Sequence, residues 1–144
     1  MPLLYPAELA SLGTTQPRLS GFNVGGKLRR YVATITLASQ VAGTDWFLLA
    51  RLRSGEKFIE GRITSSVSLG SAVVAIGTNS THASNGQFRA AAAFTAVDIP
   101  TLFGLASAKA GARLAADTDI FMTWASANLP ASGTFVAEID VLSH

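Results

Sequence analysis

Residues 135–142 read Phe-Val-Ala-Glu-Ile-Asp-Val-Leu, and this alternation is the clearest fold signal in the chain. Apolar side chains occupy every second position from Phe135 to Val141, while the positions between them include Glu138 and Asp140. Successive side chains of a β-strand point to opposite faces of the sheet. The stretch therefore predicts a strand with one buried face and one face open to solvent.

The same period of two recurs upstream in short segments separated by turn residues. Ser54-Gly55, for example, lies at hairpin spacing between two candidate strands. The further strand candidates are residues 31–37, 45–53, 57–64, 72–77, 88–97, 101–106 and 119–125. The alanine-rich residues 106–116 could instead form a helical turn or two, because alanine favours helix. Short strands divided by turns predict an all-β fold, an antiparallel β-sandwich of the jelly-roll type.

The large and small apolar side chains of these segments carry two further expectations. The residues expected in the core are Trp46, Phe88, Phe94, Trp124, Phe135 and Ile139. In residues 45–53, strict alternation groups Trp46 and Leu48 with Ala50 and Leu52 on one face. Residues 90–93 are all alanine, which is unusual because alanine is depleted in strands. Such a run suits either the close approach of another backbone, as in a subunit contact, or a thin region of the domain's own core.

Charge is scarce in this chain of 144 residues, of which 14% are charged and 49% are hydrophobic. A soluble domain has about 25% charged residues, yet no stretch approaches the roughly 20 apolar residues that cross a bilayer. We therefore expect a protein without a signal peptide, made in the cytoplasm, whose apolar surface is covered by other subunits and not by a membrane. The net charge of +2 is too small for the dense basic patch of a nucleic-acid binder.

The first 28 residues differ from the rest. They are rich in proline and glycine, which disfavour regular strands and helices, and they are nevertheless apolar. Residues 1–28 are therefore expected to form an extended N-terminal arm, and residues 29–144 the β-sandwich domain. The arm should pack either on this domain or on a neighbouring subunit. Its candidate partner-contact residues are Leu3, Leu4, Tyr5, Leu9, Leu12, Leu19 and Phe22.

Residues able to do chemistry are few and dispersed. His82 falls in a polar loop and His144 stands at the end of the sequence, and neither has a second ligand at metal-binding spacing. Two acidic pairs would each share a strand face and could hold a cation: Asp117 with Asp119, and Glu138 with Asp140. The simpler interpretation is a turn carboxylate in the first pair and a solvent-facing surface in the second. We expect no enzymatic activity, no catalytic residue, no metal and no cofactor.

Residues 119–142 contain a strand, the connection Leu-Pro-Ala-Ser-Gly-Thr and a closing strand. This segment resembles the C-terminal hairpin of small virion structural proteins of tailed bacteriophages, of the head decoration (cement) type. The apolar arm, the absence of cysteine and the many small residues are similar to that group as well. The resemblance implies an antiparallel, jelly-roll-like sandwich on the outside of a capsid, arranged as a trimer or another symmetric cluster.

The expected function is that of a non-enzymatic phage virion protein, located on the capsid surface and made in the host cytoplasm. It would decorate and stabilise the capsid through contacts with the major capsid protein and with its own copies, a trimer being favoured. One alternative is a tail or head-fibre component of the virion. Another is a carbohydrate-binding β-sandwich module, in which Trp46 and Trp124 would stack on sugar rings. An enzyme on a jelly-roll scaffold would need clustered histidines, which two distant ones do not provide.

Overall fold

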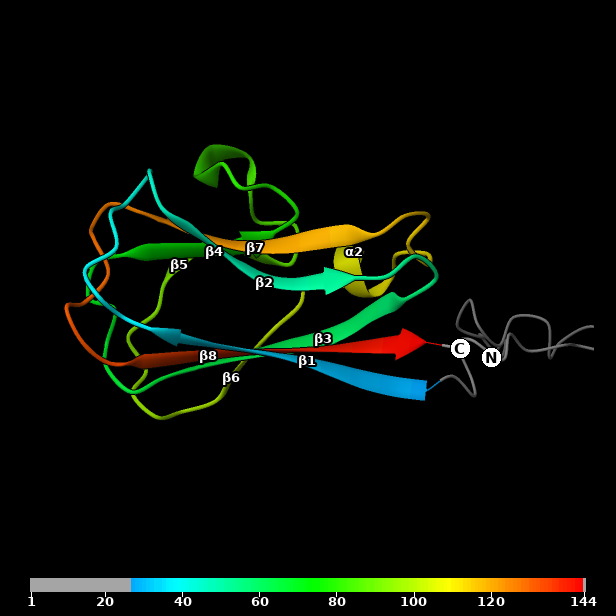
Figure 1. The fold of residues 1–144 in the computed structure, drawn as a ribbon, viewed down its shortest axis with the longest axis horizontal. Helices are drawn as coiled ribbons and strands as arrows, with labels where there is room; N and C mark the ends of the chain where they lie inside the picture. The colour runs from blue at the N-terminus through cyan, green and yellow to red at the C-terminus, as the bar shows by residue number, and fades with distance from the viewer. Residues whose placement is uncertain (1–26, 144) are drawn as a thin grey trace, which may run out of the picture.

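The computed structural model describes residues 27–143, which form two antiparallel four-stranded sheets packed face to face (Figure 1). In order across the first sheet, the strands are β1 (Lys27–Thr36), β8 (Thr134–Ser143), β3 (Lys57–Ser65) and β6 (Thr101–Phe103). In order across the second sheet, they are β2 (Trp46–Leu52), β7 (Thr118–Ala125), β4 (Val73–Gly77) and β5 (Arg89–Ala93). The all-β sandwich expected from the sequence is confirmed.

The order of pairing makes this sandwich a jelly roll. The first strand pairs with the last, β2 with β7, β3 with β6, and β4 with β5. The chain is thus a long hairpin folded at the β4–β5 connection and rolled up, which also brings β8 beside β3 and β7 beside β4. Two short helical turns interrupt the loops: η2 (His82–Ser84) and α2 (Ala106–Lys109). In residues 27–143 no helix is long and apolar enough to span a bilayer.

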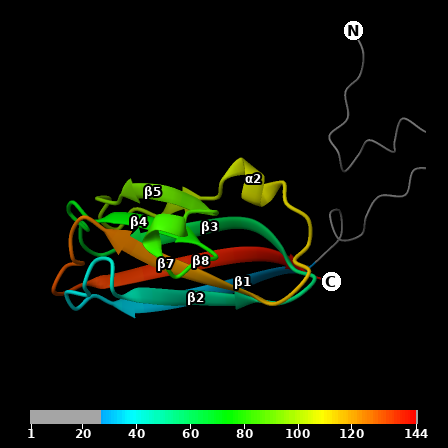
Figure 2. The same cartoon turned by 90° about the horizontal axis from the view of Figure 1, so that it is seen from above.

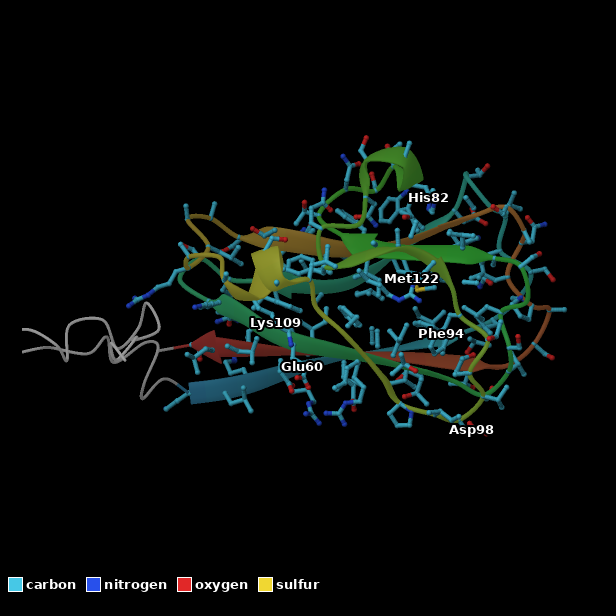
Figure 3. The ribbon with its side chains drawn as sticks, turned by 180° about the vertical axis from the view of Figure 1, so that it is seen from behind. Glu60, His82, Phe94, Asp98, Lys109 and Met122 are labelled. Carbon is cyan, nitrogen blue, oxygen red and sulfur yellow. The ribbon has the colours of Figure 1, made fainter. Side chains whose placement is uncertain are left out.

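The core lies between the sheets, and most of the residues expected there are buried. Trp124 and Phe135 are fully buried, and Phe88, Phe94 and Ile139 are nearly so. Figure 3 shows Phe94 and Met122 pointing into the space between the two layers. The indole N–H of Trp124 donates a hydrogen bond to the Gln40 carbonyl oxygen at 3.3 Å, so this buried polar group is satisfied.

Trp46 is the exception, because it is 48% exposed and does not belong to the core. A β-bulge in β2 lies between Leu48 and Ala50, so that Leu49 has no direct partner in β7. The extra residue shifts the alternation by one position. Trp46 and Leu48 consequently face solvent, whereas Leu49, Ala50 and Leu52 are buried. The strict alternation assumed for residues 45–53 was therefore wrong.

The sequence was also wrong about two connections. Ser54 and Gly55 do not close a hairpin, since β2 lies in the second sheet and β3 in the first. The resemblance implied a C-terminal hairpin, but β7 and β8 likewise lie in different sheets. Both connections arch from one sheet to the other. Turn-forming residues indicate where a chain reverses, but they do not say whether the two flanking strands hydrogen-bond to each other.

The sandwich has two lateral edges that expose different strands (Figure 2). On one side β1 and β2 lie together, and we call this side the β1/β2 edge. On the other side lie β5 and β6, linked where the Leu105 amide donates to the Phe88 carbonyl oxygen at 3.0 Å. We call this side the β5/β6 edge. The start of β1 and the end of β8 meet at one end of the sandwich, where Lys27 pairs with Ser143.

Candidate interaction surfaces

The predicted partner-contact residues of the arm, from Leu3 to Phe22, lie outside the described residues, as does His144. The strand β1 already begins at Lys27, so Lys27 and Leu28, which were assigned to the arm, belong to the first sheet. The surfaces below are therefore those of the β-domain alone.

The two acidic pairs are occupied by protein partners. Asp119 accepts from Arg51 at 2.6 and 2.9 Å, and Asp140 accepts from Arg30 at 2.7 and 3.0 Å. The hydrogen bonds from these guanidinium groups, aided by their charge, lower the pKa of both carboxyls. Asp117 accepts a hydrogen bond from the Ser54 amide at 2.9 Å. Glu138 forms an ion pair with Arg62 at 3.6 Å. Within residues 27–143 no group of three or more potential ligands could hold a metal ion.

The outer face of the first sheet is polar in the middle and apolar at its edges. Arg30–Asp140 and Arg62–Glu138 cross it, and Lys109 of α2 approaches Glu60 at 3.9 Å (Figure 3). Exposed ion pairs of this kind contribute little to stability and keep a surface hydrated. The large exposed apolar side chains of this sheet are Leu28, Val32 and Leu102, with exposures of 58–63%, and all lie on its edge strands.

A buried carboxylate joins β1 to the β2–β3 connection. Glu56 is only 2% exposed. It accepts hydrogen bonds from Arg29 at 2.9 Å, from the Tyr31 hydroxyl at 2.9 and 3.1 Å, and from the Arg53 amide at 3.0 Å. Burial and then the bond to Glu56 raise the pKa of Tyr31. This network could not be predicted from the sequence, because Arg29 and Tyr31 lie more than 20 residues from Glu56 along the chain. Its geometry fixes β1 at the end where the chain enters the domain.

On the β1/β2 edge, the second sheet presents an exposed aromatic surface. The Trp46 ring meets the Phe121 ring edge to face, with centroids 5.1 Å apart and planes at 89°. Leu48 lies beside them in the register and is 47% exposed. Tryptophan is among the side chains enriched at the positions that dominate binding energy in protein interfaces. Because a bulge positions it, this surface could not be recognised from alternation alone.

The β5/β6 edge is apolar too, but its side chains on the second sheet are small. Residues 90–93 are all exposed, so the alanine run is not a thin part of the core. Arg89 bends back and donates to the carbonyl oxygens of Val74 in β4 and of Ala92 and Ala93 in β5 at 2.5–3.3 Å, which satisfies backbone acceptors of both strands. Larger exposed residues follow on the first-sheet side of the edge, namely Ile99 and Leu102.

His82 belongs to the loop that covers the outer face of the second sheet. Asn85 anchors this loop by donating to the carbonyl oxygens of Ala75 and Phe121 at 3.2 Å and to the Thr123 hydroxyl at 3.0 Å. Gly77 permits the close approach, since a Cβ there would lie 1.9 Å from the Gln87 side-chain oxygen. The loop is therefore a packed cover, and its histidine has no ligand set around it.

One cavity of about 240 Å³ opens between α2 and the sandwich. Its lining is apolar, with the rings of Phe58 and Phe88 and the side chain of Leu114, and its polar residues are Gln87 and Ser107. The lining contains no titratable side chain. Acid–base chemistry has no side chain to use there, and the lining offers the Ser107 hydroxyl no base that would activate it as a nucleophile.

The chain resembles solved phage capsid structures in fold. A chain of the cyanophage Pam1 capsid asymmetric unit matches with a TM-score of 0.56 and 10% identity over 100% of both chains. A chain of the Ralstonia phage GP4 capsid matches with a TM-score of 0.62 and 14% identity, over 91% of this chain and 90% of that one. One from the acid-stable capsid of Helicobacter pylori bacteriophage KHP30 gives 0.58 and 11% over 80% and 86%. No protein-family model and no curated protein matches the chain. At such low identity, the likeness establishes the shared fold.

Proposed function

We propose that this chain is a non-enzymatic structural protein of a phage virion, which decorates and stabilises the capsid. The observation that carries the proposal is the jelly roll shared, over at least 80% of each chain, with chains in three phage capsid structures. In this proposal the protein is made in the host cytoplasm and sits on the capsid surface. It binds the major capsid protein and its own copies there, with a trimer favoured.

The surface chemistry supports a role in assembly. Only 14% of the residues are charged, and large apolar side chains are exposed on both lateral edges of the sandwich. Contiguous exposed apolar surface on a soluble domain marks a site of association. The arm fits the same role in this proposal. Its apolar residues, such as Leu3, Tyr5 and Phe22, would be covered by a neighbouring subunit or by the capsid.

The test is to find the protein in purified virions and to locate it there. Mass spectrometry of virions, followed by cryo-electron microscopy of particles with and without the protein, should show added density on the outer capsid surface. Density on the tail or on a head fibre would favour those alternative places in the virion. Absence of the protein from virions would overturn the proposal.

The exposure of Trp46 keeps carbohydrate binding as a second candidate. A half-exposed indole held by Phe121 is the kind of aromatic surface on which sugar rings stack. The nearby polar pair, Arg51 and Asp119, is however already engaged internally. A glycan array gives the decision: binding that is lost in Trp46→Ala supports this candidate, and an array without binding removes it.

A further inference from the structure

We infer that the β1/β2 edge of one copy binds the β5/β6 edge of the next copy, so that the protein associates head to tail. The inference deepens the proposed function by specifying how the copies would meet. It rests on that proposal only for the assumption that the protein self-associates.

In the first sheet, an exposed apolar residue of one edge, Val32, lies on the same cross-strand row as an exposed apolar residue of the other edge, Leu102. Val32 pairs with Glu138, Glu138 with Arg62, and Arg62 with Leu102, so one cross-strand row runs from edge to edge. Val32 is 58% and Leu102 is 61% exposed. A second copy placed alongside without a shift would bring its Val32 next to Leu102, because neighbouring strands lie about 4.8 Å apart. Both side chains would then be removed from water.

In the second sheet, a large side chain on one edge corresponds to small ones on the other. Trp46 pairs with Thr123, and Thr123 with Ala75. The edge strand β5 has a bulge where it passes Ala75 of β4, so that Ala75 lies opposite both Ala90 and Ala91. The same placement that joins Val32 to Leu102 therefore sets the Trp46 ring of one copy against exposed alanines of the next. Large against small is the shape match that close packing requires.

Strand direction agrees with this arrangement. Each sheet has four antiparallel strands, so its two edge strands run in opposite directions. A neighbour in the same orientation places β1 antiparallel to β6 and β2 antiparallel to β5, and the antiparallel pattern continues across the contact. A two-fold pairing of β1 edges would also be antiparallel, but it would leave Leu102 and the alanines uncovered.

We take the partner to be a second copy of this chain. In both sheets the exposed residues of the two edges lie on shared cross-strand rows, and such an alignment between the two edges of one molecule would serve no purpose for an unrelated partner. The two edges differ, so the contact is heterologous. Such contacts close into a ring when the rotation between copies permits. Copies in one and the same orientation form an open row, so the trimer favoured above, which is the smallest ring of this kind, needs an added rotation at each contact.

Edge-blocking variants test the inference with the full-length protein. Val32→Lys places a positive charge on one edge and Leu102→Lys places one on the other, and both positions are exposed, so folding is expected to persist. Thr134→Lys is the matched control, since Thr134 is exposed on the central strand β8. In analytical ultracentrifugation at tens of micromolar, the unaltered protein and the control should be oligomers and each edge variant alone a monomer. An equimolar mixture of the two edge variants should form dimers and nothing larger, because one intact edge of each kind remains.

The result that overturns the inference is equally definite. A monomeric unaltered protein overturns it, as do edge variants that remain oligomeric, even if the protein is abundant in virions. Conversely, head-to-tail dimers in the mixture would stand even if the protein were absent from virions, so the two proposals fail separately.

Cross-linking gives an independent readout because the chain contains no cysteine. Under oxidation, the double variant Val32→Cys/Leu102→Cys should form disulfide-linked oligomers on a non-reducing gel, and a Thr134→Cys/Leu102→Cys control should not. Efficient dimer formation by Val32→Cys alone would indicate a two-fold contact and would overturn the head-to-tail arrangement.

Discussion

At the scale of single residues, the two tryptophans have opposite environments and should respond differently to truncation. Trp124 is fully buried, so Trp124→Ala should lower the free energy of unfolding by about 3–5 kcal/mol. That is a large part of the roughly 5–15 kcal/mol that holds a domain together. Urea unfolding followed by circular dichroism measures the loss. Trp46→Ala is the control and should unfold nearly as the unaltered protein does, so equal losses in both variants would contradict the structure.

Tyr31 should make stability fall at alkaline pH. Its pKa is raised in the folded state by burial and by the bond to Glu56, so folding favours the protonated phenol. The stabilisation is complete below the unfolded pKa of about 10 and is lost as the pH rises through the folded value. Tyr31→Phe should cost about 1–2 kcal/mol near neutrality, since Glu56 loses a donor. The difference in unfolding free energy between the two proteins should shrink above pH 10, and a constant difference would contradict this account.

At the scale of elements, the sequence pattern predicted all eight strands, but strict alternation misassigned the faces of β2. Trp46 and Leu48 face solvent there because a bulge separates Leu48 from Ala50, and β3 has a similar register shift between Phe58 and Glu60. A bulge depends on cross-strand partners that are distant in sequence. Strand bounds differed from the prediction in both directions, since β5 stops at Ala93 although the pattern continues to residue 97, while β1 begins at Lys27 and not at residue 31. The exposed residues of the β1/β2 and β5/β6 edges could not be predicted either, because they too depend on pairing between strands that are distant in sequence.

The edge strand β5 should depend on Arg89. This side chain is partly buried, and it donates to carbonyl oxygens of β4 and β5. Arg89→Met keeps the length of the side chain but removes these charge-assisted bonds, each worth about 1.5–3 kcal/mol at most. Hydrogen exchange measured by mass spectrometry should accelerate in residues 89–93 more than in the core strand β8. Arg51→Met, on an exposed ion pair, is the control and should leave β5 unchanged.

At the scale of the whole molecule, the sequence predicted the sandwich, because the period of the pattern is a property of the entire chain. The need for partners, inferred from the low charge, stays a prediction. The register between distant strands, which aligns Val32 with Leu102, could not be predicted, since it depends on how the roll closes. The Glu56 network escaped prediction for the same reason.

The role of the arm is likewise tested on the whole molecule. Deleting residues 1–20 should leave the β-domain folded, with a thermal melt close to that of the full chain, and should weaken binding to neighbouring copies or to capsids in a particle-binding assay. Apolar segments gain about 25 cal/mol per Å² only when something covers them. Outright unfolding would assign the arm to the domain's own core, and undiminished particle binding would show that it is not a clamp.

The position of β8 has a consequence for when the protein becomes able to assemble. Of the strands within residues 27–143, this one is made last, yet there it is the only sheet partner of β1 and it also borders β3. At a synthesis rate of about 5–20 residues per second, the first sheet stays divided until residues 134–143 have left the ribosome. The β1/β2 edge therefore cannot be complete before β8 has been made. In the proposed association of copies, a chain that still lacks β8 has no ordered β1 edge to offer to a neighbour.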